Sequence, residues 1–295
     1  MRNLNELSYK VFFQIFDTKV QPILMYSAEL WGSQRLETVE RVHLLACKQF
    51  LGVPRLTPNK IVYGDLGRYP MYIISYIRVL KYWFKLLSMP LDRLPRQAYD
   101  MLLGLDEKGK QCWASKVRNM LCSSGFGLVW LQQGVGDVKM FISVFRQRLC
   151  DMFIQEWSST IENRDRYIQY RSIKTVFEPE LFVTTLVKFQ MRTVYAMLRA
   201  GMFPVNANLA RYKNDENKKF CPFCEKILEN ELHLLYICPL YVHERNKFKL
   251  TNVTHNFDGN FTALLNKHDK KTVVSLSLFL QRTNTIRSRF MESLV

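Results

Sequence analysis

The sequence predicts a mainly α-helical protein, and three observations support this class. Apolar residues recur at intervals of three and four along most of the chain, as in helices that bury one face. Candidate helices end at strong stop signals, such as Gly52 with Pro54 just beyond it. Hydrophobic residues make up 48% of the 295 positions, and we find no internal repeat or low-complexity tract. The chain can therefore bury a real core, in one large or two ordinary domains.

The first third of the chain predicts three helical stretches. Residues 8–32 are apolar at helical intervals, with a break or restart at Pro22. A second helix is expected within residues 35–53, and a third from about Met71 to just before Pro90. The predicted core stripe of the second helix consists of Leu36, Val39, Val42, Leu45, Ala46 and Phe50.

The rest of the chain predicts further helices and one boundary between subdomains. Residues 122–137, "CSSGFGLVWLQQGVGD", are rich in glycine and give the best boundary between two subdomains. Long amphipathic helices are expected over 138–161 and 179–201, and another over 272–290. Residues 211–219 form a charged turn that leads into a group of cysteines.

The charge balance favours a polyanionic partner. Lys and Arg outnumber Asp and Glu by 42 to 26, a formal net charge of +16, which suits nucleic acid or an anionic membrane surface. A basic protein without such a partner remains the alternative. We find no signal peptide and no apolar run long enough to span a membrane, so we expect a nuclear or cytoplasmic protein that does not insert into membranes.

Seven cysteines in such a compartment do not predict disulfides. Cys47, Cys112, Cys122 and Cys150 are scattered among apolar neighbours, as small core residues are. The other three lie in "CPFCEKILENELHLLYIC", residues 221–238, with the spacing C-x2-C-x8-H-x4-C.

That spacing predicts a metal site formed by Cys221, Cys224, His233 and Cys238. The first two lie on a tight turn with Pro222, and the last two lie five residues apart in a short predicted helix. Three thiolates and one imidazole suit Zn²⁺ in a closed, structural site. The alternative is four independent buried residues. His243 could replace a ligand, although we expect it to be a surface histidine.

The same residues resemble the C-terminal cysteine–histidine motif of non-LTR (LINE-type) retrotransposon reverse transcriptases. In that motif C-x2-C, an acidic stretch, a histidine, Cys-Pro and a charged helix follow in this order, as they do in "FCPFCEKILENELHLLYICPLYVHERNKF". Residues 8–100 resemble the helical thumb region that follows the polymerase palm. The resemblance implies a thumb-like helical region at 1–122, a helical connector at 123–212, the zinc motif at 213–250 and a helical tail at 251–295.

The sequence departs from that family at the residues of catalysis. The family holds two Mg²⁺ ions with paired aspartates, and this sequence contains no Asp-Asp pair. Palm, fingers and an endonuclease have no counterpart in these residues. Phosphate-binding-loop, H-E-x-x-H and G-x-S-x-G motifs are also absent. We therefore expect no catalytic residues and no small-molecule substrate.

These observations predict a non-catalytic protein that binds RNA or DNA with weak sequence specificity. Phosphate contacts are expected from Lys188, Arg192, Arg199, Lys218, Lys219, Arg245, Lys247 and Lys249. Phe223 and Tyr236 could stack on unpaired bases or pack around the metal. Three alternatives stay open: a structural or interaction protein, a non-functional fragment of a mobile element, or an accessory to a polymerase palm supplied in trans.

Overall fold

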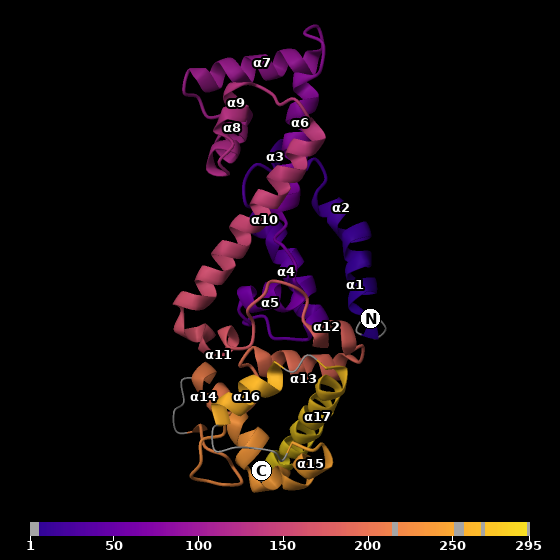
Figure 1. The fold of residues 1–295 in the computed structure, drawn as a ribbon, viewed down its shortest axis with the longest axis vertical. Coiled ribbons are helices and arrows are strands. Elements are labelled where there is room, and N and C mark those ends of the chain that lie inside the picture. The colour runs from indigo at the N-terminus through magenta and orange to yellow at the C-terminus, as the bar shows by residue number, and fades with distance from the viewer. Residues whose placement is uncertain (1–5, 214–217, 251–256, 267–268, 294–295) are drawn as a thin grey trace. The chain divides into compact units, whose positions relative to one another are not determined.

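The computed structural model describes residues 6–213, 218–250, 257–266 and 269–293, which form helices joined by short loops (Figure 1). These residues contain no β-strand, only isolated bridges between Leu66 and Pro179 and between Phe220 and Leu228. The mainly α-helical class is thus confirmed. None of the helices described here has the length and apolar composition needed to cross a membrane.

The chain divides into two compact units, each built from separate segments. The first unit comprises residues 1–14, 45–68 and 160–295, and the second comprises 15–44 and 69–159. Three of the four divisions therefore fall within helices, and the fourth falls in the loop after Leu66. The glycine-rich segment 122–137, which the sequence favours as a boundary, lies entirely inside the second unit.

The second unit is organised around aromatic side chains. Trp83 is fully buried, stacks on Trp130 with ring centroids 5.7 Å apart, and donates an indole hydrogen bond of 2.9 Å to Tyr99. Its elements are the π-helix η2 (Phe16–Val20), α2 (Gln21–Leu24), α3 (Ala28–Trp31), the first part of α4 (Glu37–Leu51), α6 (Tyr72–Leu87), α7 (Leu94–Glu107), α8 (Trp113–Ser123), α9 (Gly127–Leu131) and most of α10 (Val138–Asn163).

The first unit packs its helices against the C-terminal helix α17. Helices α12, α13 and α15 all contact α17. The elements of this unit are most of α1 (Tyr9–Ile15), the second part of α4, α5 (Asn59–Leu66), η3 (Asp165–Tyr167), α11 (Ile168–Arg171), α12 (Leu181–Thr185), α13 (Phe189–Arg199), α14 (Asn206–Lys213), η5 (His233–Ile237), η6 (Pro239–Tyr241), α15 (Val242–Lys247), α16 (Phe257–Leu265) and α17 (Lys270–Glu292).

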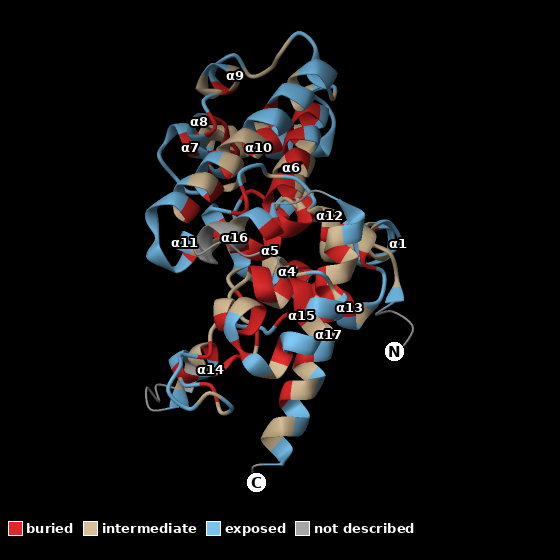
Figure 2. Cartoon of the chain, turned by 60° about the horizontal axis from the view of Figure 1, so that its bottom comes forward, coloured by how far each residue is buried: buried red, intermediate tan, exposed pale blue. Residues whose placement is uncertain are grey.

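Two details differ from the sequence-based predictions. The helix expected over 179–201 is two helices, α12 and α13, because Leu186 adopts an extended conformation. In α4 the buried positions are His43, Cys47, Phe50 and Leu51, whereas Leu36, Val42 and Leu45 of the predicted stripe are 37 to 47% exposed. Figure 2 shows such buried positions in red along α4, α5 and α6.

The buried face of α4 includes His43 because this side chain has a local partner. Its Nδ1 lies 2.9 Å from Glu40, and its ring packs 5.4 Å from the ring of Phe16. A hydrogen-bonded imidazole can be buried at modest cost. Counting apolar residues alone therefore placed part of the stripe on the wrong face, although Phe50 is buried as predicted.

Candidate metal centre

Cys221 and Cys224 are positioned by a tight turn, as the sequence predicted. The backbone N–H of Cys221 donates to Ile227 O at 2.8 Å, and the N–H of Glu225 donates to Cys221 O at 2.7 Å. Glu225 closes the turn with φ of +58°, the left-handed region. The bridge between Phe220 and Leu228 holds the two arms together. Both thiols consequently belong to one small hairpin.

His233 and Cys238 are brought together by a π-helical turn, η5. In an α-helix, residues five apart point about 140° away from each other. Here the N–H of Cys238 donates to His233 O at 2.8 Å, an i to i+5 bond that widens the turn. The wider turn reduces that angle, so both side chains can face one point. The short predicted helix is therefore present, with an irregular geometry that suits its ligands.

The four side chains form a cluster that can hold a metal ion. Their ligand atoms all lie within 4.8 Å of one another. The Sγ atom of Cys238 is 3.9 Å from that of Cys221 and 3.8 Å from that of Cys224. A tetrahedron of thiolates about 2.3 Å from its centre has edges of about 3.8 Å. The same distances exclude a disulfide, whose sulfur atoms are about 2.05 Å apart.

The polar atoms of the cluster are suited to coordinate an ion. Both ring nitrogens of His233 are buried without a hydrogen-bond partner. Burial lowers the pKa of His233 and raises the pKa of the Cys224 and Cys238 thiols. The imidazole is therefore ready to coordinate, while these thiols hold their protons until a cation replaces them. Because a metal must displace those protons, its binding strengthens as the pH rises.

Residues outside the hairpin hold the cluster in place. Arg245 is only 6% exposed, and its Nη2 donates to Cys238 O at 2.5 Å while Nη1 donates to Leu234 O at 3.3 Å. Arg245 from α15 therefore fixes the backbone that carries two of the ligands. The prediction that Arg245 contacts phosphate is wrong, since its donors already serve the interior.

A buried carboxylate links the hairpin to α17. Glu229 accepts two hydrogen bonds of 2.8 Å from Arg287, and its Oε2 also accepts the backbone N–H of Asn206 at 2.7 Å. Glu229 is 1% exposed, so the pair is shielded from water. Hydrogen bonds to Glu229 consequently connect the hairpin of the cluster to both α14 and α17.

Arg192, for which a phosphate contact was predicted, is likewise buried. Only 1% of Arg192 is exposed, and burial lowers its pKa to about 10. Its guanidinium lies 3.9 Å from the centroid of the Phe50 ring and donates to three carbonyls, those of Phe50, Leu186 and Val187. Two of these carbonyls become available because the helix breaks between α12 and α13. Arg192 therefore compensates that break and is not free to bind phosphate.

Arg199 is the centre of a buried ion-pair network and is also removed from the predicted interface. Its Nη2 lies 3.1 Å from Asp65 and 3.3 Å from Glu180, which in turn pairs with Lys174 at 2.7 Å. Tyr170 donates a further hydrogen bond of 3.0 Å to Asp65. Burial alone would lower the pKa of Arg199, but the charges of Asp65 and Glu180 raise it. Arg199 is therefore charged, and its guanidinium group is paired with Asp65 and Glu180.

The other predicted contact residues are accessible. Lys188, Lys218, Lys247 and Lys249 are exposed, as is Phe223 at 44%. Lys219 is partly exposed, and Tyr236 is partly buried. His243 is exposed and lies outside the metal cluster. The structure thus keeps the predicted lysines at the surface and takes all three predicted arginines into the interior.

Two further residues of the hairpin share these properties but were not predicted. Phe220 is 40% exposed, with Lys219 Nζ 5.9 Å from its ring centroid, and Lys226 is exposed at the turn. Phe223 packs edge-on against Phe290 of α17. The run "KKFCPFCEK", which alternates basic and aromatic residues around the cysteines, could have indicated both.

No protein-family model matches this chain, and neither does any curated protein or solved structure with which it was compared. The Cys3His cluster is therefore the feature that defines the site.

Proposed function

We propose that the chain is a non-catalytic nucleic-acid-binding protein whose Cys3His cluster holds a structural Zn²⁺. The observation that carries the metal is the cluster geometry, with thiol separations of 3.8 and 3.9 Å and an imidazole that has no other partner. A tetrahedral set of three thiolates and one imidazole suits Zn²⁺ among the common ions. Four protein ligands leave no position for a substrate, which favours a structural role.

The binding surface we propose is the cysteine hairpin itself. It presents two exposed rings, Phe220 and Phe223, beside Lys218, Lys219 and Lys226 within nine residues. Aromatic rings next to cations are the elements that bind single-stranded nucleic acid, by stacking on bases and pairing with phosphates. The exposed Lys188, Lys247 and Lys249 would add phosphate contacts elsewhere on the same unit. Such contacts give affinity with little sequence specificity.

The proposed origin follows from the resemblance to LINE-type reverse transcriptases. The cysteine–histidine motif and the helices before it have the order found in that family, while the paired aspartates of polymerase catalysis are absent. We infer that this chain corresponds to the region after the palm and binds nucleic acid without extending it. A palm supplied in trans would make it an accessory to a polymerase.

The test is a titration of the metal-loaded protein with a fluorescent single-stranded RNA and a duplex DNA at about 50 and 200 mM salt. With about six phosphate contacts, affinity at the higher salt should fall about 300-fold for the single-stranded RNA and about 2,000-fold for the duplex DNA. Replacing both Phe220 and Phe223 by Ala should weaken RNA binding about 10-fold or more, because two stacked bases are lost. The variant Lys81→Gln, an exposed lysine of the second unit, is the control.

Three results would contradict parts of this proposal. Elemental analysis that finds less than one zinc per chain would contradict the proposed zinc site. Equal binding by the double Phe variant would remove the hairpin from the interface. If neither RNA nor DNA binds at 50 mM salt, the net charge of +16 has no such role. A combined Cys224→Ser, His233→Ala variant distinguishes a hairpin held by metal from one that binds without it.

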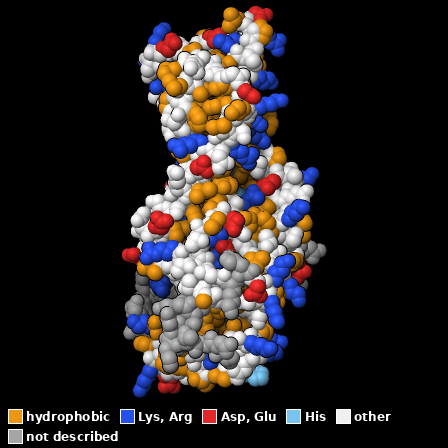
Figure 3. Space-filling view, in the orientation of Figure 1, with side chains coloured by type: hydrophobic (Ala, Val, Ile, Leu, Met, Phe, Trp, Pro, Cys, Tyr) orange, Lys and Arg blue, Asp and Glu red, His pale blue; other side chains and the backbone are white. Residues whose placement is uncertain are grey.

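A protein-interaction role is the second candidate, and one surface favours it. On α7, Leu94, Met101 and Leu105 recur at positions i, i+7 and i+11 and are 79, 74 and 43% exposed. Figure 3 shows other hydrophobic side chains in patches on the viewed face, between Lys and Arg side chains. Exposed apolar surface of this kind marks interfaces or aggregation sites. Light scattering of the purified protein would separate a stable partner-free monomer from self-association.

A further inference from the structure

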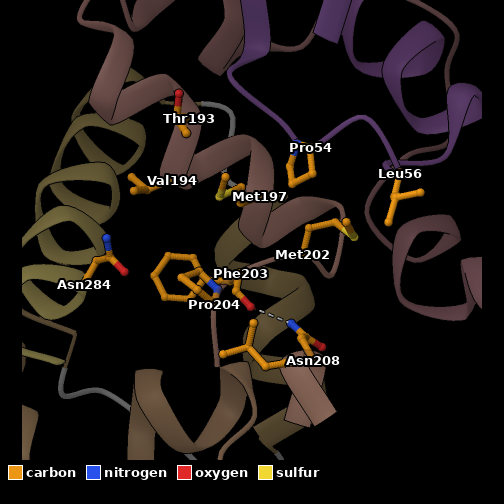
Figure 4. A pocket seen from close by; sticks show the side chains of 11 residues that line it. Pro54, Leu56, Thr193, Val194, Met197, Met202, Phe203, Pro204, Asn208 and Asn284 are labelled. Atoms are coloured by element: carbon orange, nitrogen blue, oxygen red, sulfur yellow. Dashed lines mark hydrogen bonds between the residues drawn. The ribbon is translucent and has the colours of Figure 1, made fainter. Parts of the chain in front are cut away.

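The first unit contains an apolar cavity that is distinct from the metal cluster. The cavity has a volume of about 360 Å³ and lies among the loop after α4, helix α13, the turn before α14, and α17 (Figure 4). Its apolar walls are Pro54, Leu56, Met197, Met202, Phe203 and Leu209. This volume is at the lower end of the roughly 300–1,000 Å³ typical of ligand sites. The cavity therefore has room for one or two large apolar side chains and not for an extended cofactor.

Most of the cavity wall is apolar, and three polar side chains line it, those of Thr193, Asn208 and Asn284. Asn208 donates through Nδ2 to Phe203 O at 2.9 Å and to Glu231 at 2.6 Å, so its amide hydrogens face the protein (Figure 4). Thr193 Oγ1 is buried without a hydrogen-bond partner. A nucleobase carries several polar atoms on its edges, more than these side chains can pair, and the unpaired ones cost free energy. The two methionines have flexible thioether side chains that adapt to the shape of an apolar guest. The occupant should therefore be mainly apolar.

An exposed arginine borders the cavity. Arg55 is exposed and lies between the two lining residues Pro54 and Leu56. No Asp or Glu occurs within three sequence positions of any lining residue. Two carboxylates approach this region, but Glu229 and Glu231 are buried and bonded to Arg287 and Asn208, respectively.

We propose that this cavity receives a large apolar side chain from an acidic peptide segment of a partner protein. Arg55 would pair with a carboxylate beside that side chain. Leu56 is 76% exposed and Leu209 is 36% exposed, so docking would also cover apolar surface at the rim. An apolar anchor in a pocket surrounded by charge pairs is the usual form of a small interface hot spot. The inference is independent of nucleic-acid binding, because no lining residue belongs to the cysteine hairpin.

The experiment selects random 12-residue peptides displayed on phage against the full-length, metal-loaded protein. Peptides that also bind Leu209→Trp, a variant that fills the cavity from its partly exposed rim, are removed. The enriched peptides should carry Leu, Phe or Trp flanked by Asp or Glu. A synthetic peptide from that set should bind the Leu209→Trp and Arg55→Glu variants at least 10-fold more weakly than the unchanged protein.

The matched control is Arg282→Glu, which makes the same charge change on the same unit. Arg282 is exposed and precedes the lining residue Asn284 by two positions on α17, so its side chain points about 160° away from the cavity. Its peptide affinity should stay within about 2-fold of the unchanged protein. Circular dichroism and metal content establish that each variant is folded. If Leu209→Trp does not fold, the peptide affinity of Arg55→Glu tests the proposal, because this variant leaves the cavity walls intact.

Several results would overturn the proposal. Enriched peptides without acidic residues would exclude the charge complementarity. Selected peptides whose affinity for Arg55→Glu or for folded Leu209→Trp is unchanged would place binding elsewhere. Methyl NMR signals of Met197 and Met202 that shift with a single-stranded RNA and not with the peptide would assign the cavity to nucleic acid. Signals that shift only with protein concentration would assign it to a second copy of this chain.

Discussion

The two compact units differ in the kind of contact that fills their interiors. In the second unit the centre is aromatic, with Trp83 stacked on Trp130 and bonded to Tyr99. In the first unit the interior includes buried charges whose partners are far apart in the sequence, such as Asp65 with Arg199. Hydrophobic burial has no required direction, whereas a buried charge depends on one particular partner. The first unit should therefore be much more sensitive to single substitutions of polar residues.

Removing the metal should produce the largest difference in stability between the two units. Cys238→Ser deletes a ligand, and structural zinc sites contribute about 10–16 kcal/mol to the folded state in small zinc domains. We expect loss of bound metal and rapid proteolysis within 160–295, while a fragment near 69–159 resists the protease. Cys122→Ser, at an exposed cysteine of the second unit, should retain metal and stability. A Cys238→Ser protein with normal metal content would show that the cluster is not a metal site.

Breaking the buried ion pair should have the next largest effect. Asp65→Ala leaves Arg199 without its principal partner in a fully buried position, which costs about 3–5 kcal/mol. Urea unfolding measures this loss. The double variant Asp65→Ala, Arg199→Met removes both charges and should recover part of it. If the double variant is less stable than the single one, the attraction between Asp65 and Arg199 itself stabilises the fold, beyond preventing an unpaired buried charge.

A conservative change in the aromatic centre should cost less. Trp83→Phe keeps most of the apolar contact with Trp130 but leaves the Tyr99 hydroxyl without the indole donor. Such a loss costs about 1–3 kcal/mol. The free energy of unfolding of the second unit should fall by that amount, with metal content unchanged. Loss of the metal in Trp83→Phe would mean that the units do not unfold separately.

The smallest effect on stability should come from Lys188, which lies four residues before the buried Arg192. Lys188→Gln changes an exposed side chain and should alter the free energy of unfolding by less than about 0.5 kcal/mol. Its RNA affinity should fall about 2- to 4-fold, since one phosphate contact is lost. Arg192→Gln should instead destabilise the protein by about 1–3 kcal/mol, because carbonyls of three residues lose their donor. Equal stability of the two variants would contradict the buried position of Arg192.

The four candidate metal ligands could be predicted because their chemistry is local. Cys221 and Cys224 lie on one turn, and His233 and Cys238 lie at the two ends of η5, although the π-helical geometry that brings the second pair together was not predicted. The stops of the early helices were predictable for the same reason, since Gly52 with φ of +72° ends α4 as a left-handed residue does. The boundaries of the units were not, because contacts between separate segments of the chain define them, such as 45–68 with 160–295 in the first unit.

The basic residues show where local reasoning fails. Lys188, Arg192 and Arg199 occur at similar helical intervals, yet only the lysine is exposed. Both arginines are buried because planar guanidinium groups can satisfy several acceptors at once, here backbone carbonyls for Arg192 and carboxylates for Arg199. The sequence contains the arginines and the acceptors but does not show that Phe50 and Asp65 lie beside them.

The sequence by itself determined the helical class and the four residues of the candidate metal cluster, since helical periodicity and ligand spacing are properties of short segments. Only the tertiary structure decided which charges face water, which helix positions face the interior, and where the cavity bounded by Met197 and Met202 lies. Those features depend on contacts between residues far apart in the chain, such as Asp65 with Arg199 and Glu229 with Arg287. Such contacts form only when the whole first unit is folded.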